Sequence, residues 1–216
     1  SWIDFIRFVA KKNKPIIIAS GASTLEDVDR AINSLSQSDV VLMQCNTNYT
    51  IENDKHKYTN ISVLNHFHQR YPELILGLSD HTLGHGSVVG SIALGARVIE
   101  KHFTDDNDRI GPDHKFALNP LKWREMVELS YEVFETLGDG NKKIEDNEKN
   151  AFIVQRRSIV LRKKMAKGDK ITKDDIDFLR PCPMDSFHPY EYKEIIGKKL
   201  TRDINENESI LKSDIC

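Results

Sequence analysis

The sequence has no apolar run that approaches the roughly 20 residues needed to cross a bilayer. Its first residues also lack the basic stretch and apolar core of a signal peptide. A net charge of −2 gives no general attraction to nucleic acid or to a membrane surface. We therefore expect a cytoplasmic protein that binds neither nucleic acid nor membrane.

Cysteine is scarce, and its three positions are Cys45, Cys182 and Cys216. They are far apart and odd in number, and no two of them form Cys-x-x-Cys, which argues against a disulfide scaffold or a structural zinc site. The Gly-x-Gly-x-x-Gly signature of dinucleotide-binding folds is also missing. With 39% apolar and 30% charged residues, the composition is that of an ordinary globular protein.

Short apolar runs alternate with amphipathic segments along the first part of the chain. The runs predict buried strands at 15–19, 40–43, 74–78 and 97–100. The segments between and after them predict helices, the first of which begins with a capping box of Ser23 and Glu26. An earlier helix is predicted over 1–12, with Trp2 and Phe5 in the core. This alternation is typical of a parallel sheet covered on both faces.

The fold class that fits best is α/β, as the C-terminal half of a (β/α)8 TIM barrel over residues 1–137. A complete barrel needs about 250 residues, so we expect four more strands upstream. Residues 138–150 predict a polar linker, and 151–216 a small separate domain. Within that domain, 168–176 and 207–215 resemble each other, which predicts internal two-fold symmetry.

Polar side chains follow the last two predicted strands, where barrel enzymes place their active sites. His81 ends the third strand and His102 the fourth. Because neighbouring strand ends are about 5 Å apart, the two imidazoles could share a divalent metal. Two ordinary hydrogen-bonded loop histidines are the alternative.

Three further loops carry candidate site residues. Asp113 lies on the turn 111–115 and could grip a hydroxyl or act as a base. The loop 44–49 offers amides, a hydroxyl and a phenol to an oxygen-rich ligand. Ser20 precedes a helix N-terminus that could bind phosphate. Surface turns and loops are the alternative for all three.

Three motifs, at 77–84, 95–104 and 111–114, resemble the sialic acid synthase family, which includes N-acetylneuraminate, legionaminate and pseudaminate synthases. The tail resembles the small antifreeze-like SAF domain of these enzymes, through 157–160, 167–169 and 179–181. The resemblance covers the chain from about residue 14 to its last residue.

The resemblance implies roles for individual residues. His81 and His102 would bind a divalent metal, Mn²⁺ before Mg²⁺ or Co²⁺. Ser79 would contact phosphoenolpyruvate, and Asp113 the sugar. The remaining implied contacts to substrate come from Thr47, Tyr49, Ser20 and Arg180. The last would reach the active site of a partner in a domain-swapped homodimer.

The implied reaction joins phosphoenolpyruvate to an N-acylated amino sugar, giving a nine-carbon 2-keto acid and phosphate. The acceptor, N-acetylmannosamine or a diacetamido-trideoxy hexose, stays open. Since much of the phosphoenolpyruvate pocket belongs to strands outside this sequence, we expect the 216 residues alone to be inactive. The alternatives are another metal-dependent barrel that condenses phosphoenolpyruvate or cleaves aldols, and a non-catalytic dimerising fragment.

Overall fold

The computed structural model describes residues 1–35, 39–48 and 56–216. The chain divides into two compact units, Ser1–Gly140 and Asn141–Cys216. Over the described ranges, no helix is both long and apolar enough to cross a membrane.

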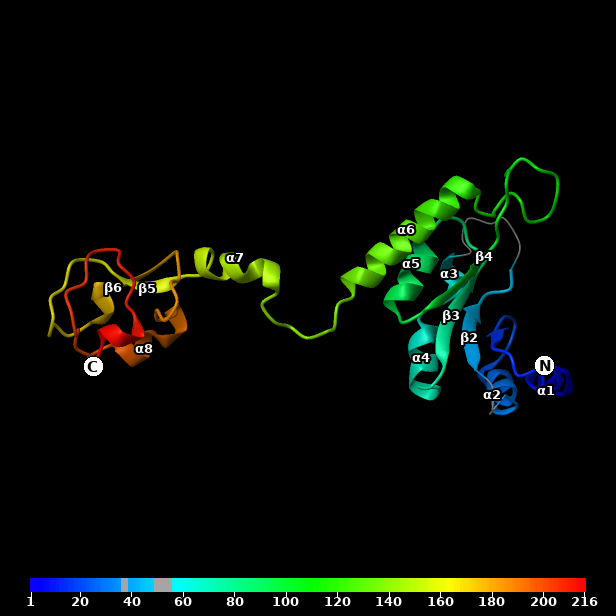
Figure 1. Ribbon diagram of the computed structural model, residues 1–216, viewed down its shortest axis with the longest axis horizontal. Helices are drawn as coiled ribbons and strands as arrows, with labels where there is room; N and C mark the ends of the chain where they lie inside the picture. Colours follow the sequence, from blue (N-terminus) through cyan, green and yellow to red (C-terminus); the bar gives the residue numbers. More distant parts are fainter. Residues whose placement is uncertain (36–38, 49–55) are drawn as a thin grey trace. The chain divides into compact units, whose positions relative to one another are not determined.

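Four parallel strands form the sheet of the first unit, in the order β1-β2-β3-β4. They are β1 (Ile16–Ala19), β2 (Val40–Cys45), β3 (Ile75–Asp80) and β4 (Val98–Lys101). The helices are α1 (Ile3–Ala10), α2 (Leu25–Asn33), α3 (His56–Thr59), α4 (Val63–Arg70), α5 (Gly86–Ala93) and α6 (Pro120–Thr136). Figure 1 shows α4, α5 and α6 along one side of the strands. This half of a β/α barrel is the predicted fold.

The two faces of the sheet differ because successive side chains of a strand point to opposite sides. On the helix-covered face, Leu42 and Leu76 pack with Leu64 and Phe67 of α4. The opposite face, which we call the inner face, carries the row Cys45–Ser79–Glu100 near the carboxyl ends of the strands. The strand register therefore determines which side chains lie next to one another on the inner face.

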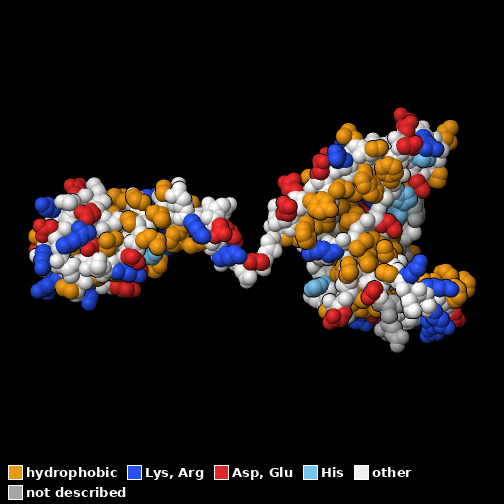
Figure 2. All heavy atoms as spheres, viewed as in Figure 1, with side chains coloured by type: hydrophobic (Ala, Val, Ile, Leu, Met, Phe, Trp, Pro, Cys, Tyr) orange, Lys and Arg blue, Asp and Glu red, His pale blue; other side chains and the backbone are white. Residues whose placement is uncertain are grey.

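Two predictions of burial on the first unit were wrong. Ile17 lies on the inner face of the edge strand β1 and is 57% exposed, because the helices of the described chain cover the other face. Trp2, the N-cap of α1, and Phe5 within α1 are also exposed, and their rings stack on each other rather than in a core. Figure 2 shows hydrophobic side chains gathered over α6 as well. A strand that is apolar throughout therefore does not ensure two covered faces.

The capping box of α2 is one residue later than predicted. Thr24, not Ser23, is the N-cap, and its hydroxyl accepts the Asp27 backbone N–H. Asp27, not Glu26, completes the box by accepting the Thr24 backbone N–H at 3.0 Å. The Ser23 hydroxyl instead donates to the Gly21 carbonyl. The sequence holds both pairs at the same spacing, so the spacing alone could not choose between them.

The second unit contains one antiparallel pair of strands and several short helices. Its elements are η1 (Asp146–Glu148), α7 (Lys149–Val154), β5 (Ser158–Leu161), η2 (Lys173–Asp175), β6 (Ile176–Leu179), η3 (Pro189–Glu191), α8 (Tyr192–Ile195) and η4 (Lys212–Asp214). Thus η1 and the start of α7 lie inside the stretch predicted as a linker. The core of the unit is aliphatic, with Ile159, Leu161, Ile195, Ile204 and Ile210 fully or almost fully buried.

The predicted internal repeat is confirmed by matching hydrogen bonds. Met165 and Ile204, which occupy equivalent repeat positions, exchange two backbone bonds of 3.0 Å. The Gly168 N–H donates to the Leu200 carbonyl, and in the other copy the Asn207 N–H donates to the Leu161 carbonyl, both at 2.8 Å. Gly168 and Asn207 also share a positive φ. The two copies therefore build one symmetric core.

Each copy ends in a short helix held by a buried carboxylate, and Asp175 is the carboxylate of the first copy. Lys163 Nζ lies 2.8 Å from it, and the Thr172 backbone N–H donates to it at 2.9 Å. The ion pair with Lys163 and the bonds from Thr172 lower the pKa of Asp175 from 3.8 to about 2. In the second copy Arg202 and Asp214 pair in the same way.

We expect Asp175→Asn to remove an acid-sensitive part of stability. A lowered folded-state pKa stabilises the fold above about pH 4, and this contribution disappears as the pH falls toward 2. Because Lys163 is exposed, solvent screening keeps the contribution of the Asp175 ion pair to stability below about 2 kcal/mol. Urea unfolding of the chain, followed by methyl NMR signals of the second unit, should show the wild-type advantage shrinking between pH 4 and pH 2. The exposed Asp174→Asn is the control, and an advantage that persists at pH 2 would contradict this account.

Candidate functional site

The centre of the candidate site is the pair His81 and His102. Their ring centroids lie 5.1 Å apart, and the planes are tilted by 54°. His81 is only 8% exposed. The Phe116 ring packs against His102 in an edge-to-face arrangement, with 5.0 Å between centroids. Two imidazoles this close can each offer one nitrogen to the same divalent ion.

The strands β3 and β4 bring the histidines together because their last residues, Asp80 and Lys101, are register partners. Each histidine follows directly after one of these residues. Asp80 and Lys101 themselves point to the helix-covered side, where Lys101 Nζ bonds the Asp80 carboxylate. This buried ion pair was not predicted. Opposite charges at the last residues of two neighbouring strands are the signal that would have revealed it.

The predicted Ser79 lies on the inner face, one row before the histidines. Its hydroxyl donates to Glu100 Oε1 at 2.7 Å. Glu100 was not among the predicted site residues. Glu100 precedes His102 by two residues, so the alternation of side chains turns both to the same side. Period-two reasoning alone would have placed Glu100 at the site.

The loop after β2 brings Thr47 to the same edge. Cys45 Sγ lies 3.6 Å from Thr47 Oγ1 and 4.0 Å from His81 Nδ1. Gly21 leaves room for Thr47, because a Cβ there would come within 1.8 Å of its hydroxyl oxygen. Tyr49, which was predicted to line the pocket, lies outside the described residues.

The loop after β4 returns Asp113 to the histidines. Asp113 Oδ2 is 3.6 Å from His102 Nδ1. The side-chain amide of Asn107 fixes this loop by donating to the carbonyls of His114 and Ala117, at 2.7 and 2.9 Å. The structure thus brings Thr47, Ser79, His81, His102 and Asp113 to one edge of the sheet.

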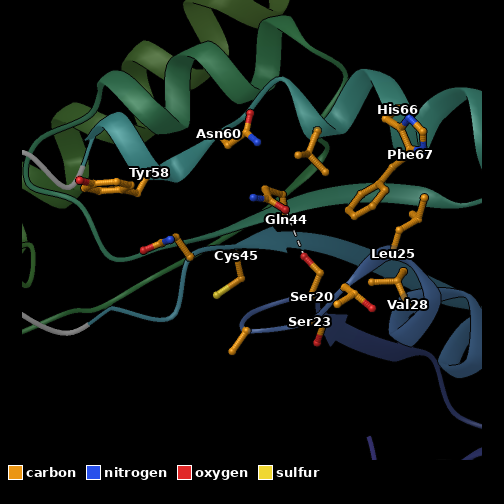
Figure 3. A pocket seen from close by; sticks show the side chains of 14 residues that line it. Ser20, Ser23, Leu25, Val28, Gln44, Cys45, Tyr58, Asn60, His66 and Phe67 are labelled. Atoms are coloured by element: carbon orange, nitrogen blue, oxygen red, sulfur yellow. Dashed lines mark hydrogen bonds between the residues drawn. The ribbon is translucent and has the colours of Figure 1, made fainter.

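Ser20 lies apart from this group. It follows Ala19 on β1, and the alternation of side chains turns it to the helix-covered side. Its hydroxyl donates to Gln44 Oε1 at 3.1 Å, and Gln44 Nε2 donates to the Thr59 carbonyl at 3.0 Å. Figure 3 shows this pair inside a cavity of about 580 Å³. The cavity is also lined by Thr24, Leu25, Val28, Asn46, Tyr58, Asn60, Val63, His66 and Phe67.

The second unit carries the remaining predicted residue. Arg180 is exposed and follows the last residue of β6. Close by, the buried Cys182 lies with its Sγ 3.2 Å from His188 Nδ1.

Among the residues that the structure describes, no three His, Cys, Asp or Glu side chains gather tightly enough to hold a metal by themselves. An ion on the histidine pair would therefore need ligands besides such a group.

Comparisons with known proteins find relatives over nearly the whole chain. The chain is 33% identical over 217 residues to an N,N'-diacetyllegionaminic acid synthase of Legionella pneumophila, covering 97% of this chain and 59% of that protein. It is 31% identical to a pseudaminic acid synthase of Campylobacter jejuni, covering 98% of this chain and 60% of that protein. The chain thus spans about three fifths of the length of these relatives.

A solved structure shares the fold. It is a spore coat polysaccharide biosynthesis protein E from Chromobacterium violaceum, with a TM-score of 0.74 at 20% identity. The match covers 99% of this chain and 64% of that one. The pattern of the NeuB family matches residues 1–142, and that of the SAF domain matches 156–215. The resemblance to sialic acid synthases is therefore confirmed: the chain belongs to the NeuB family and carries a SAF domain.

Proposed function

We propose that the gene product that carries this chain condenses phosphoenolpyruvate with an N-acylated amino sugar. The observation that supports this most strongly is the histidine pair at the carboxyl edge of the sheet, with Ser79 and Asp113 beside it, in a chain of the NeuB family. The two relatives are named as synthases of legionaminic and pseudaminic acid. The acceptor is N-acetylmannosamine or a diacetamido-trideoxy hexose.

His81 and His102 are the residues that would hold a divalent ion, for which Mn²⁺ is our first choice. Two imidazole donors beside a carboxylate suit such an ion, and they leave positions open for water and substrate. When bound, the ion acts as a Lewis acid toward the aldehyde oxygen of the sugar. Cys45, whose thiol lies beside His81, limits the space on one side of the pair.

The other residues bind and orient the two substrates. Ser79 contacts phosphoenolpyruvate. The family resemblance also implies substrate contacts by Thr47 and by Tyr49, the second of which lies outside the described residues. Asp113 engages sugar hydroxyls or accepts a proton from one. C3 of phosphoenolpyruvate bonds to the aldehyde carbon, water adds at C2, and the C–O bond to phosphate breaks, which leaves a nine-carbon 2-keto acid. Holding the reacting carbons together contributes to the rate, because it removes the entropy cost of bringing two substrates into register.

The second unit contributes Arg180 to the site of a partner chain in a domain-swapped homodimer. Its exposed guanidinium carries donors in a fixed fork that suits the oxygen of an acylamino group. A small unit with an aliphatic core also gains stability from packing against a partner.

The test is manganese-dependent phosphate release from phosphoenolpyruvate by the gene product, with and without a panel of acylated amino sugars. We expect release only when sugar and Mn²⁺ are both present, and its loss in His102→Ala. The exposed His68 of α4 supplies the matched control, since His68→Ala makes the same chemical change away from the site. Release without sugar, or none with any sugar, would refute the proposal. The sugar that supports the fastest release identifies the acceptor.

A further inference from the structure

A fully buried ion pair lies at the ends of β3 and β4, next to the histidine pair in sequence. The side chains of Asp80 and Lys101 are 0% and 1% exposed. The two residues are partners in the last rung of the β3–β4 ladder. The residue that follows each strand is a histidine. The ion pair is therefore the last side-chain contact between the two strands before the two candidate metal ligands.

The ion pair also holds the loop that follows His81. Asp80 accepts the Thr82 backbone N–H at 3.0 Å and the Thr82 hydroxyl at 3.1 Å. Lys101 Nζ donates to the Thr82 carbonyl at 2.6 Å, besides its bond to Asp80. Asp80 and Lys101 thus bind the residue after His81 through its N–H, its carbonyl and its hydroxyl. The backbone on either side of His81 is fixed by one buried network.

Burying two charges is costly, and an apolar pair of similar size would often be as stable or more so. The network therefore has no evident advantage for stability alone. It does have one for geometry, because it fixes two backbone segments whose next side chains face each other. We propose that Asp80 and Lys101 are positioning residues, which hold His81 and His102 at the separation that a divalent ion requires. This inference rests on the proposed function of the histidine pair.

The two histidines do not depend on the ion pair equally. The His102 carbonyl accepts the Leu118 N–H at 2.8 Å, and the Thr104 N–H donates to the Leu118 carbonyl at 2.9 Å. This second anchor holds the end of β4 independently of Lys101. The backbone beyond His81 is tied by the Thr82 bonds to the ion pair. Loss of the pair should therefore displace His81 more than His102.

The double variant Asp80→Leu/Lys101→Met separates positioning from stability, because it removes both charges and keeps the volume. Binding of Mn²⁺ to the gene product is measured by the electron paramagnetic resonance signal of the free ion. We expect an affinity about 10- to 100-fold weaker than wild type, the range seen when partners outside the ligand set are lost. The variant should stay folded, and in the metal-free protein the NMR signals of the His81 ring should move more than those of His102.

Lys101→Arg is the conservative control. A guanidinium can still bond to Asp80 and to the Thr82 carbonyl, so this variant should bind Mn²⁺ nearly as tightly as wild type. A double variant that melts normally and binds Mn²⁺ as tightly as wild type would overturn the inference.

Two other outcomes are equally decisive. If the wild-type protein itself does not bind Mn²⁺, the proposed function of the histidine pair fails, and this inference fails with it. If the double variant does not fold, Thr82→Val decides, because it removes only the hydroxyl's bonds to Asp80 and Ser87 at nearly constant shape. Unchanged Mn²⁺ affinity in a folded Thr82→Val would then overturn the inference, and a weakened affinity would support it.

Discussion

Replacing His81 by alanine is expected to weaken Mn²⁺ binding by the gene product at least about 100-fold, because losing a ligand should cost more than losing an outer partner. His81 supplies one of the two imidazoles of the site, and no group of three His, Cys, Asp or Glu side chains among the described residues could hold the ion in its place. The Cys45 thiol, 4.0 Å from His81 Nδ1, is too distant to take over without movement of the loop. Calorimetric titration with Mn²⁺ measures the change directly.

His68→Ala provides the control for this experiment as well, since His68 is exposed on α4. It should bind Mn²⁺ as wild type does. Equal affinity in His81→Ala and wild type would show that the ion binds elsewhere. His81 and His102 would then be hydrogen-bonded loop histidines, and the proposed chemistry would have no metal site.

Gly77→Ala is expected to destabilise the first unit by about 2 kcal/mol, as overpacking of a tight core does. Gly77 lies in the row Met43–Gly77–Val98 of the inner face. A Cβ there would come within 2.6 Å of the Val98 carbonyl oxygen and 3.0 Å of Met43 Cε. The methionine side chain can turn away, but the carbonyl belongs to the neighbouring strand. The strands β3 and β4 must therefore separate, two residues before Ser79 and Glu100.

Gly86→Ala is the matched control, because a Cβ at Gly86 meets no atom within 4 Å. It begins α5, where alanine is the better helix former, so stability should not fall. Urea unfolding of the two variants, followed by the fluorescence of Trp123, gives the comparison. Equal stabilities would mean that the sheet relaxes around the added methyl group without cost.

The strands and the grouping of the site were predictable because both follow from simple periodicities. Apolar runs predicted each strand to within a few residues, and the rule that parallel strands end at one edge placed His81 beside His102. The exposure of Trp2 was not predictable, since a helix stripe records that a residue favours burial and not what covers it. For the same reason, the apolar sequence of β1 predicted burial of Ile17, although nothing in the described chain covers its face of the sheet.

The separation of Ser20 from the site could have been predicted by the alternation of side chains along β1. That test needs the exact start of the strand, which the sequence leaves uncertain by a residue or two. The Asp80–Lys101 pair is a different case. It depends on register between two strands, and a single sequence contains register only indirectly.

The symmetric bonds of the second unit have a consequence for how it folds. Met165 bonds to Ile204, Gly168 to Leu200, and Asn207 to Leu161, so these bonds join one copy of the repeat to the other. A copy formed alone would leave the backbone groups of Met165 and Leu161 without those partners. The chain must close a long loop before any of these bonds form, and folding is slower the farther apart the partners lie in the sequence. The unit should therefore fold late and in one cooperative step, with neither half persisting as an intermediate.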